Sequence, residues 1–401
     1  MRSLSNILVT GGAGFIGSNF IHWLFAREDF TGRIINLDAL TYAGNLENLA
    51  DIEARYGAGA SAGEAASETG ATSSPRYIFI QGDICDRPLV ERLFAEYSID
   101  TVVHFAAESH VDRSILGPEA FVRTNVLGTY TLLDVARTAW QSATSQSAAP
   151  SASQSPSAKT AAAKTAGALR DDVLFHHVST DEVFGSLGEQ GYFTEETPYD
   201  PRSPYSASKA ASDHLAKAYW HTYGLPLTIS NCSNNYGPYQ FPEKLIPLMI
   251  LNMLEGKPLP VYGDGRNIRD WLYVEDHNEA VWMIMKAGQA GRTYNIGGEN
   301  EWENIRLLGR LIELVAEEAG LDAARLRALI TYVKDRPGHD RRYAIDCSRL
   351  KTELGWRQRV TFDEGLRKTV RWYLDNRTWV DHVRSGAYRA WIEKNYLKRG
   401  V

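Results

Sequence analysis

Cysteine is scarce in this chain, and its few thiols exclude several classes of protein. The three cysteines, Cys85, Cys232 and Cys347, lie far apart in 401 residues and form no Cys-x-x-Cys pair. This distribution supports neither a disulfide framework nor a thiolate metal site, and it suits a reducing compartment. The sequence also lacks a basic-then-apolar leader and any apolar run of membrane-spanning length. We therefore expect a cytoplasmic protein without a membrane partner.

An excess of positive charge is absent as well. The chain has 43 Lys and Arg residues against 49 Asp and Glu residues, which gives a net charge of -6. This balance argues against nucleic acid or an anionic membrane as the main partner. The apolar content of 44% is that of an ordinary globular protein. A chain of 401 residues is too long for one compact core, so two lobes are expected.

Short apolar strands alternate with amphipathic helices through the first part of the chain. Continuous apolar strands between helices indicate a parallel sheet covered on both faces. We therefore predict an α/β fold with a Rossmann-type, doubly wound parallel sheet over residues 1–240. The pattern places strands at 6–9, 33–38, 77–80, 101–105, 173–178 and 227–230, and helices at 18–26, 88–97, 119–140 and 204–223.

Two stretches interrupt the alternation, and the pattern changes after residue 240. Residues 57–75 and 141–170 are dominated by small and polar residues, and they are interpreted as flexible insertions. Each lies between a helix and the next strand, so we expect it at the amino edge of the sheet, away from the ligands. Residues 241–401 are predicted to form mainly a smaller, mixed α/β substrate-binding lobe. Part of 263–300 is expected to return to the first domain.

A glycine turn separates the first strand from the first helix. Gly11, Gly14 and Gly17 allow a tight turn, close approach of a pyrophosphate and packing of the helix on the strand. Asp38 ends the second strand, where a carboxylate binds a ribose diol and repels a 2'-phosphate, which favours NAD over NADP. Asp83 follows the third strand. It is interpreted either as a contact to the adenine or as a plain turn residue.

A cluster of hydroxyl, phenol, ammonium and acid groups predicts a proton-transfer site. Tyr205 and Lys209 are four residues apart on a predicted helix and therefore share a face. Thr180 ends the fifth strand, and Asp181 and Glu182 follow it directly. Successive residues of a strand point to opposite faces, so both carboxyls can reach one ligand only if the chain turns at Asp181. From the residues alone, a solvated acidic loop explains the pair equally well.

Several motifs resemble those of a known family. The glycine spacing and Tyr205-x-x-x-Lys209 resemble the extended short-chain dehydrogenases/reductases, and further segments resemble the dTDP-glucose 4,6-dehydratases within that superfamily. The resemblance covers nearly everything except the two insertions. Phe184 stands where Tyr is usual, without an expected consequence. The segments that carry the resemblance are 106–112, 179–185, 231–238, 241–245, 269–271 and 335–340.

The resemblance implies a reaction and a role for each catalytic residue. Thr180 occupies the place usually held by Ser. Tyr205, assisted by Thr180 and Lys209, takes the C4 hydroxyl proton of dTDP-glucose while NAD accepts a hydride. Glu182 then removes the C5 proton, Asp181 protonates the C6 hydroxyl as water leaves, and the hydride returns to C6. A 4-keto-6-deoxy sugar results, and NAD stays bound through turnover.

The resemblance also implies contacts and an assembly, namely a homodimer joined by helices near 119–140 and 204–223. The expected cofactor-binding residues are Gly11, Gly14, Phe15, Ile16, Gly17, Asp38, Leu40, Thr41, Asp83, Ile84, Ala106, Ala107, Ser109, Thr124, Tyr205, Lys209 and Asn235. The expected substrate-binding residues are His110, Thr180, Asn234, Lys244, Leu245, Pro260, Tyr262, Arg269, Asn304, Asp335 and His339.

Alternative functions remain open at this stage. The residues do not distinguish dTDP from UDP, and a 4-epimerase or decarboxylase of sugar nucleotides shares the fold. An NAD-sensing regulator without activity is disfavoured, because the complete catalytic set is present. His176 and His177 do not predict a metal site, since neighbouring strand residues point apart and no third ligand lies near.

Overall fold

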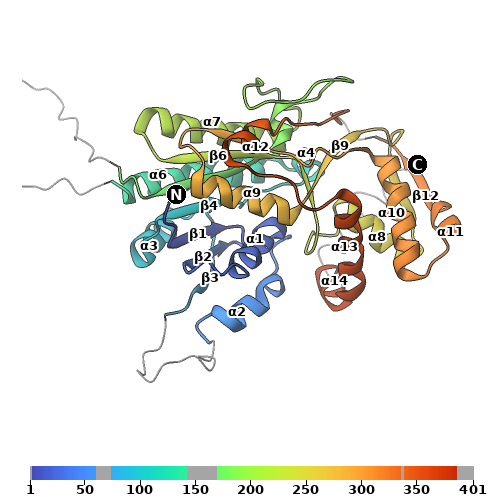
Figure 1. The fold of residues 1–401 in the computed structure, drawn as a ribbon, viewed down its shortest axis with the longest axis horizontal. Coiled ribbons are helices and arrows are strands. Elements are labelled where there is room, and N and C mark those ends of the chain that lie inside the picture. The colour runs from blue at the N-terminus through green and yellow to red at the C-terminus, as the bar shows by residue number, and fades with distance from the viewer. Residues whose placement is uncertain (1, 60–73, 142–168, 336–337, 386–401) are drawn as a thin grey trace, which may run out of the picture.

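The computed structural model describes residues 2–59, 74–141, 169–335 and 338–385 (Figure 1). Most of the two low-complexity insertions, 60–73 and 142–168, lies outside the described residues. Each of them joins a helix to the following strand, from α2 to β3 and from α6 to β5. The helices of the described chain are all too short or too polar to cross a membrane.

A seven-stranded parallel sheet forms the centre of the first lobe, which confirms the predicted Rossmann-type fold (Figure 1). Its strand order is β10-β6-β5-β4-β1-β2-β3, so the order reverses between β1 and β4. Such a reversal opens a crevice at the carboxyl ends of the strands. The strands are β1 (Asn6–Thr10), β2 (Arg33–Asp38), β3 (Tyr77–Gln81), β4 (Thr101–His104), β5 (Leu174–Thr180), β6 (Leu227–Cys232) and β10 (Thr293–Ile296).

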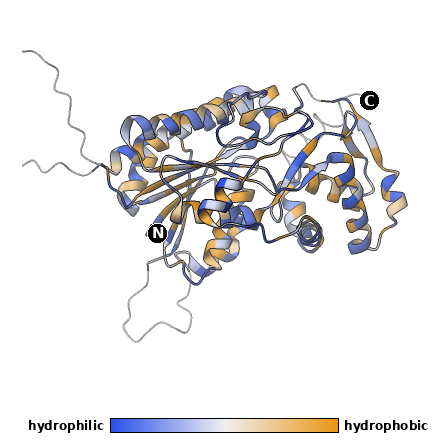
Figure 2. Cartoon of the chain, turned by 45° about the horizontal axis from the view of Figure 1, so that its top comes forward, coloured by the Kyte–Doolittle hydropathy of each residue, from blue (hydrophilic) through white to orange (hydrophobic). Residues whose placement is uncertain are grey.

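Helices cover both faces of this sheet, as the near-continuous burial of its strands requires. The helices carry hydrophobic and hydrophilic residues together, so each can face both the sheet and the solvent (Figure 2). One core contains α1 (Phe15–Phe25), α2 (Ala50–Tyr56), α9 (Val274–Ala287) and α12 (Ser348–Leu354). The other contains α3 (Arg87–Tyr97), α6 (Thr129–Ala139) and α7 (Pro204–Tyr223).

The second lobe has a separate hydrophobic core and two small sheets. Its three-stranded sheet joins β7 (Asn234–Tyr236), β9 (Ile268–Tyr273) and β11 (Glu301–Glu303), and its two-stranded sheet joins β8 (Leu259–Tyr262) and β12 (Ile330–Val333). Its helices are α8 (Leu245–Leu254), α10 (Asn304–Ala319), α11 (Ala323–Arg327), α13 (Phe362–Asp375) and α14 (Arg377–Val383).

One predicted helix is interrupted in the structure. The segment expected as a single helix over 119–140 follows α4 (Val111–Leu116) and consists of α5 (Pro118–Phe121), a π-helical turn η2 (Val122–Gly128) and α6. The side chain of Asn125 in this turn accepts a hydrogen bond from the Glu108 N–H and donates to the Glu108 carbonyl, both at 2.9 Å. This tertiary anchor accounts for the wider turn, because it fixes η2 to the segment after β4.

Candidate active site

A cavity of about 350 Å³ lies at the carboxyl ends of the parallel strands, where the strand reversal predicts a ligand site. It brings together all five predicted catalytic residues and all but one of the predicted cofactor residues; the exception is Leu40. The predicted residues in its wall are Gly11, Gly14, Phe15, Ile16, Gly17, Asp38, Thr41, Asp83, Ile84, Ala106, Ala107, Ser109, Thr124, Thr180, Asp181, Glu182, Tyr205, Lys209, Asn234, Asn235 and Lys244.

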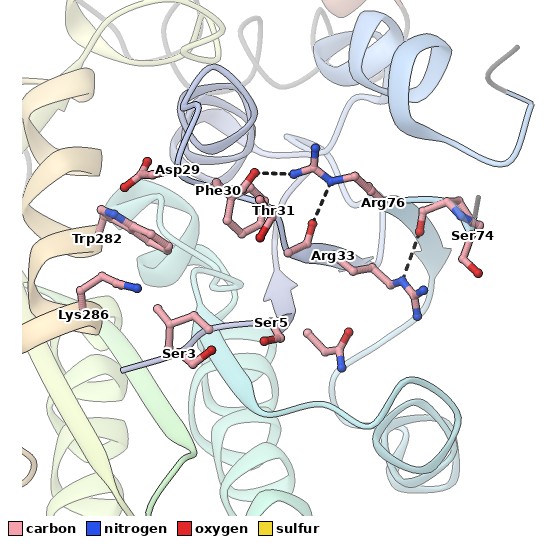
Figure 3. Close-up of a pocket in the computed structure, with 14 residues that line it drawn as sticks. Ser3, Ser5, Asp29, Phe30, Thr31, Arg33, Ser74, Arg76, Trp282 and Lys286 are labelled. Atoms are coloured by element: carbon pink, nitrogen blue, oxygen red, sulfur yellow. Dashed lines mark hydrogen bonds between the residues drawn. The ribbon is translucent and has the colours of Figure 1, made fainter. Parts of the chain in front are cut away.

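A second cavity, of about 420 Å³, lies at the opposite edge of the sheet (Figure 3). Two arginines in its wall are occupied by backbone carbonyls: Arg76 donates to Phe30 at 2.6 Å and to Gly32 at 3.1 Å, and Arg33 donates to Pro75 at 3.1 Å. The cavity contains none of the predicted site residues. The five predicted catalytic residues line the cavity at the carboxyl edge instead.

The glycine turn leaves no room for side chains where the first strand passes into α1. Gly11 has φ of +73°, and an added Cβ would lie 2.7 Å from the Cα of Ala106. At Gly17 an added Cβ would lie 2.3 Å from the carbonyl oxygen of Gly11. Both glycines line the cavity at the start of α1, where a bound pyrophosphate needs backbone without side chains.

The two acidic residues predicted near the nucleoside lie in the same wall. Asp38 is buried, and its carboxylate accepts hydrogen bonds from the N–H groups of Ala13 at 2.9 Å and Leu40 at 2.8 Å. Burial raises the pKa of Asp38. Leu40 itself has φ of +51° and shapes this loop through its backbone. Asp83 accepts a bond from the Cys85 N–H at 2.8 Å, as a turn residue does, and also faces the cavity.

The acid pair lies on a turn, as its chemistry requires. Strand β5 ends at Thr180, and the 3₁₀ helix η3 (Asp181–Phe184) begins at the next residue. The Thr180 hydroxyl accepts a hydrogen bond from the Glu182 N–H and donates to the Asp181 carboxyl, both at 3.3 Å. This cap directs the chain out of the strand, so consecutive carboxyls line one cavity.

The two acids differ in how deeply they are buried. Asp181 is 2% exposed, whereas Glu182 is partly exposed. Burial, with the nearby charges of Glu182 and Asp270, raises the pKa of Asp181 well above its ordinary value. The Oδ2 atom of Asp181 has no hydrogen-bond partner among the described residues. This shift of the pKa favours the protonated form of Asp181, the form in which a carboxyl can donate a proton.

Tyr205 and Lys209 project from the first turns of α7 toward the same cavity. Lys209 is buried and donates a hydrogen bond to the Val178 carbonyl at 2.8 Å. Burial, followed by the charge of Glu182, raises the pKa of Tyr205, and a hydrogen bond with Thr180 lowers it. Burial lowers the pKa of Lys209. The phenol is thus hydrogen-bonded to the threonine hydroxyl, and the lysine lines the same cavity.

The remaining predicted substrate residues lie outside the walls of this cavity. His110 caps α4, with its Nε2 atom 3.9 Å from Glu243. Tyr262 and His339 have ring centroids 6.1 Å apart, and His339 Nδ1 lies 2.6 Å from Asp335. Leu245 begins α8, Asn304 begins α10, and Pro260 and Arg269 lie on β8 and β9. The guanidinium of Arg269 donates to the carbonyls of Ile268 at 2.8 Å and Asp340 at 3.0 Å.

The cavity also contains residues that the sequence did not single out. Tyr42, Glu108 and Glu243 line it beside the predicted ones. Glu243 is 2% exposed and lies 3.3 Å from Arg113, whose guanidinium stacks on the Tyr42 ring at 3.6 Å. Glu243 precedes Lys244 in the segment 241–245, which was the available signal. Among the described residues, no three His, Cys, Asp or Glu side chains are arranged to hold a metal ion.

Comparisons with known proteins show the relatives of this chain. A family model described as GDP-mannose 4,6 dehydratase matches residues 8–369. The dTDP-glucose 4,6-dehydratase of Salmonella typhimurium is 50% identical over 402 residues, covering 98% of this chain and 99% of the relative. The enzyme of that description from Xanthomonas campestris strain B100 is 51% identical over 383 residues, covering 95% and 97%.

This chain is also similar to solved structures of sugar-nucleotide enzymes. DesIV, a dTDP-glucose 4,6-dehydratase from Streptomyces venezuelae with NAD and TYD bound, is 42% identical with a TM-score of 0.76. The match covers 94% of this chain and 99% of DesIV. A UDP-glucose 4-epimerase from Thermotoga maritima, with UDP-glucose, is 26% identical with a TM-score of 0.72, covering 92% and 99%.

Proposed function

Because the chain belongs to the GDP-mannose 4,6 dehydratase family, we propose that it catalyses the NAD-dependent dehydration of dTDP-glucose to dTDP-4-dehydro-6-deoxyglucose. It is similar over almost its whole length to dTDP-glucose 4,6-dehydratases, including structures with NAD bound. The single observation that carries the proposal is the acid pair Asp181 and Glu182 on a turn beside Tyr205 and Lys209. A 4-epimerase needs to move a hydride at C4 but has no water to remove, so it has no use for this pair.

The residues around the glycine turn fit NAD. The bare backbone at Gly11 and Gly17 and the N-terminus of α1 suit a pyrophosphate, and the free lone pairs of Asp38 suit a ribose diol. Lys209 and Thr180 are proposed to bind the nicotinamide ribose. When bound, NAD supplies the hydride acceptor for C4 and the hydride donor for C6.

The chain's own residues are proposed to move three protons. Tyr205 as phenolate accepts the proton of the C4 hydroxyl; because burial raises the pKa of this phenol, the phenolate is proposed to depend on the positive charge of Lys209. The C4 ketone acidifies C5–H, and Glu182 removes that proton as general base. Asp181, kept protonated by its burial, donates its proton to the C6 hydroxyl, which leaves as water. Glu182 then returns a proton to C5, and the site regains its starting protonation through solvent.

The second lobe is proposed to hold the nucleotide half of the substrate. We assign residues 1–240, with part of 263–300, to NAD binding and 241–401 mainly to substrate binding. Lys244 and Arg269 are candidates for the diphosphate, because an Arg fork and a Lys charge suit its oxygens. The remaining candidates for substrate contacts are His110, Asn234, Leu245, Pro260, Tyr262, Asn304, Asp335 and His339.

We also propose a homodimer in the cytoplasm. Exposed apolar side chains gather on α4, η2, α6 and α7, which supports the expectation that helices near 119–140 and 204–223 join two copies. These side chains are Ile115, Leu116, Val122, Leu127, Tyr130 and Tyr223. Sedimentation of the wild type against Val122→Glu tests the assembly, since a buried charge at a dimer interface is expected to give a monomer.

The reaction itself is tested by supplying dTDP-glucose and UDP-glucose together in D₂O. The expected product comes from dTDP-glucose, is lighter by one water apart from label, and carries solvent deuterium at C5. Mass spectrometry and NMR follow both sugars in one sample. Simple inversion at C4 without loss of water would refute the dehydratase function, and preferential use of UDP-glucose would refute the nucleotide assignment.

A further inference from the structure

Asp213 is a buried carboxylate that has no role in the proposed reaction. It lies on α7, one turn after Lys209, and its side chain is 0% exposed. Its Oδ1 atom lies 3.0 Å from His177 Nε2. Its Oδ2 atom accepts hydrogen bonds from the Ser179 hydroxyl at 2.8 Å and the Tyr199 hydroxyl at 2.9 Å. His177 is the third donor in the tautomer that carries its proton on Nε2. Burial raises the pKa of Asp213, but the contacts with His177, the charge of Lys209 and the Ser179 hydroxyl outweigh burial and lower it, which favours the carboxylate.

These three donors come from segments that carry catalytic groups. Ser179 and His177 belong to the end of β5, directly before Thr180. Tyr199 lies in the segment before α7, and its ring packs against Phe184 of η3 with centroids 5.3 Å apart. Asp213 therefore ties α7 both to the strand that ends at Thr180 and to the segment that packs on η3. A second tie between α7 and β5 is the bond from Lys209 to the Val178 carbonyl.

The charge of Asp213 also faces Lys209. Lys209 interacts electrostatically with groups on four elements, namely Asp213 on its own helix, His177 on β5, His104 on β4 and Cys232 on β6. Burial lowers the pKa of both histidines and raises the pKa of Cys232 to about 12, so these three are neutral near pH 7. Of the groups named, Asp213 is the one that carries a negative charge.

We propose that Asp213 is a positioning residue for the reaction: its carboxylate fixes α7 against the end of β5 and supplies the counter-charge that keeps Lys209 an ammonium. Lys209 is otherwise a buried cation whose desolvation favours the neutral amine. A neutral amine neither favours the phenolate of Tyr205 nor donates as strongly to its partners. This inference rests on the proposed function, since it concerns the proton removal at C4.

The test compares Asp213→Asn with Tyr199→Phe. The first variant removes the charge but keeps the shape, because the hydroxyls of Ser179 and Tyr199 can also accept bonds from an amide. The second removes one hydrogen bond to the carboxylate and keeps the charge. Both are measured in single turnovers of dTDP-glucose in which NADH absorbance reports oxidation at C4 from pH 6 to 10. We expect the alkaline limb of Asp213→Asn to move to lower pH by about 1 unit.

Tyr199→Phe is expected to keep the wild-type alkaline limb. An unmoved limb in a folded, NAD-loaded Asp213→Asn protein would overturn the inference while the proposed function stands. A wild type that leaves dTDP-glucose unchanged would overturn both. If Asp213→Asn does not fold, Asp213→Ser removes the same charge, leaves space for a water, and is expected to show the same shift.

Discussion

Gly17 offers a sharp test of the glycine turn, because its substitution by Ala conflicts with backbone atoms alone. An added Cβ would lie 2.3 Å from the carbonyl oxygen of Gly11 and 2.8 Å from the Cα of Gly12. Ordinary contacts of a Cβ are 3.4 Å or longer, so the turn and α1 must separate by about 1 Å at this point. Flexible side chains cannot absorb that shift, and the turn that faces the pyrophosphate moves with it.

The expected magnitude follows from two opposing effects. Overpacking of this kind costs about 1–3 kcal/mol of folding free energy. Ala is favoured over Gly within a helix by about 1 kcal/mol, which offsets part of that cost. We therefore expect Gly17→Ala to lower the free energy of unfolding of the NAD-free protein by at most about 2 kcal/mol. NAD binding should weaken as well, because the backbone N–H groups no longer point to one place.

Two further substitutions serve as matched controls. At Gly14, an added Cβ meets one atom, the Gly11 carbonyl oxygen at 3.3 Å, so Gly14→Ala should fold almost as stably as the wild type yet obstruct the pyrophosphate. At Gly309, within α10, nothing lies within 4 Å, so Gly309→Ala should stabilise by about 0.5–1 kcal/mol and leave NAD binding unchanged.

Urea unfolding of the NAD-free proteins and NAD titration give the two quantities separately. The reasoning is refuted if Gly17→Ala is as stable as the wild type and binds NAD equally well. Normal NAD affinity in Gly14→Ala would show instead that the pyrophosphate does not approach the turn at that residue.

Three further predictions address the two acids and α14, the last helix of the described residues. Glu182→Gln should abolish deuterium uptake at C5 while C4 oxidation persists; NMR of the recovered sugar checks this, and unchanged uptake would remove the assigned role. Asp181→Asn should slow loss of water yet stabilise the fold at pH 7. The pKa of Asp181 is raised in the folded state, so the wild type loses stability as the pH rises above the unfolded pKa of about 3.9. Equal unfolding curves for the two proteins at pH 7 would contradict this. Trp379→Phe removes a buried 2.7 Å hydrogen bond to Asn48 and should cost about 1–3 kcal/mol by thermal unfolding, a loss that should be absent if this contact does not hold α14 in place.

The central sheet could be predicted from the sequence because its strands are rich in apolar residues and separated by helical patterns. The three-stranded sheet could not. Its strands β7 and β11 have three residues each, too few for a period to appear. Their partners are also remote in sequence, since Asn234 pairs with Trp271 and Glu301 with Asp270. Such short strands exist through tertiary pairing, which no local pattern records.

The same distinction applies to the interrupted helix. The apolar spacing over 119–140 predicts one continuous helix, and its π-helical turn depends on the bonds between Asn125 and the backbone of Glu108. A helical period describes which face is buried, but it cannot show that one side chain is held by another segment. The wide turn therefore reflects a tertiary contact and not the local helical pattern of the sequence.

The cavity was predictable in part because parallel strands end at the same edge. Motifs that follow β1, β2, β4, β5 and β6 meet there, so residues from Gly11 to Asn235 line one wall. Tyr42 could not be predicted, because it is linked to this group through its contact with Arg113, whereas the place of Glu243 next to Lys244 in the segment 241–245 was a usable signal. Asp213 likewise reads in the sequence as one more polar residue on a helix, and its three donors come from other elements.

Asp181 and Glu182 are adjacent in the sequence, yet their side chains lie in different environments. On a continuing strand, Asp181 and Glu182 would point to opposite faces, and at most one could reach a sugar bound in the cavity. The 3₁₀ turn that begins at Asp181 brings both into one wall but gives them unequal burial. Desolvation, together with the nearby charge of Glu182, then raises the pKa of Asp181, since two like charges in one site are costly. In the proposed mechanism the position of this single turn makes one carboxylate the acid and the other the base, so a substitution that prolonged β5 by one residue should abolish elimination while leaving C4 oxidation to Tyr205.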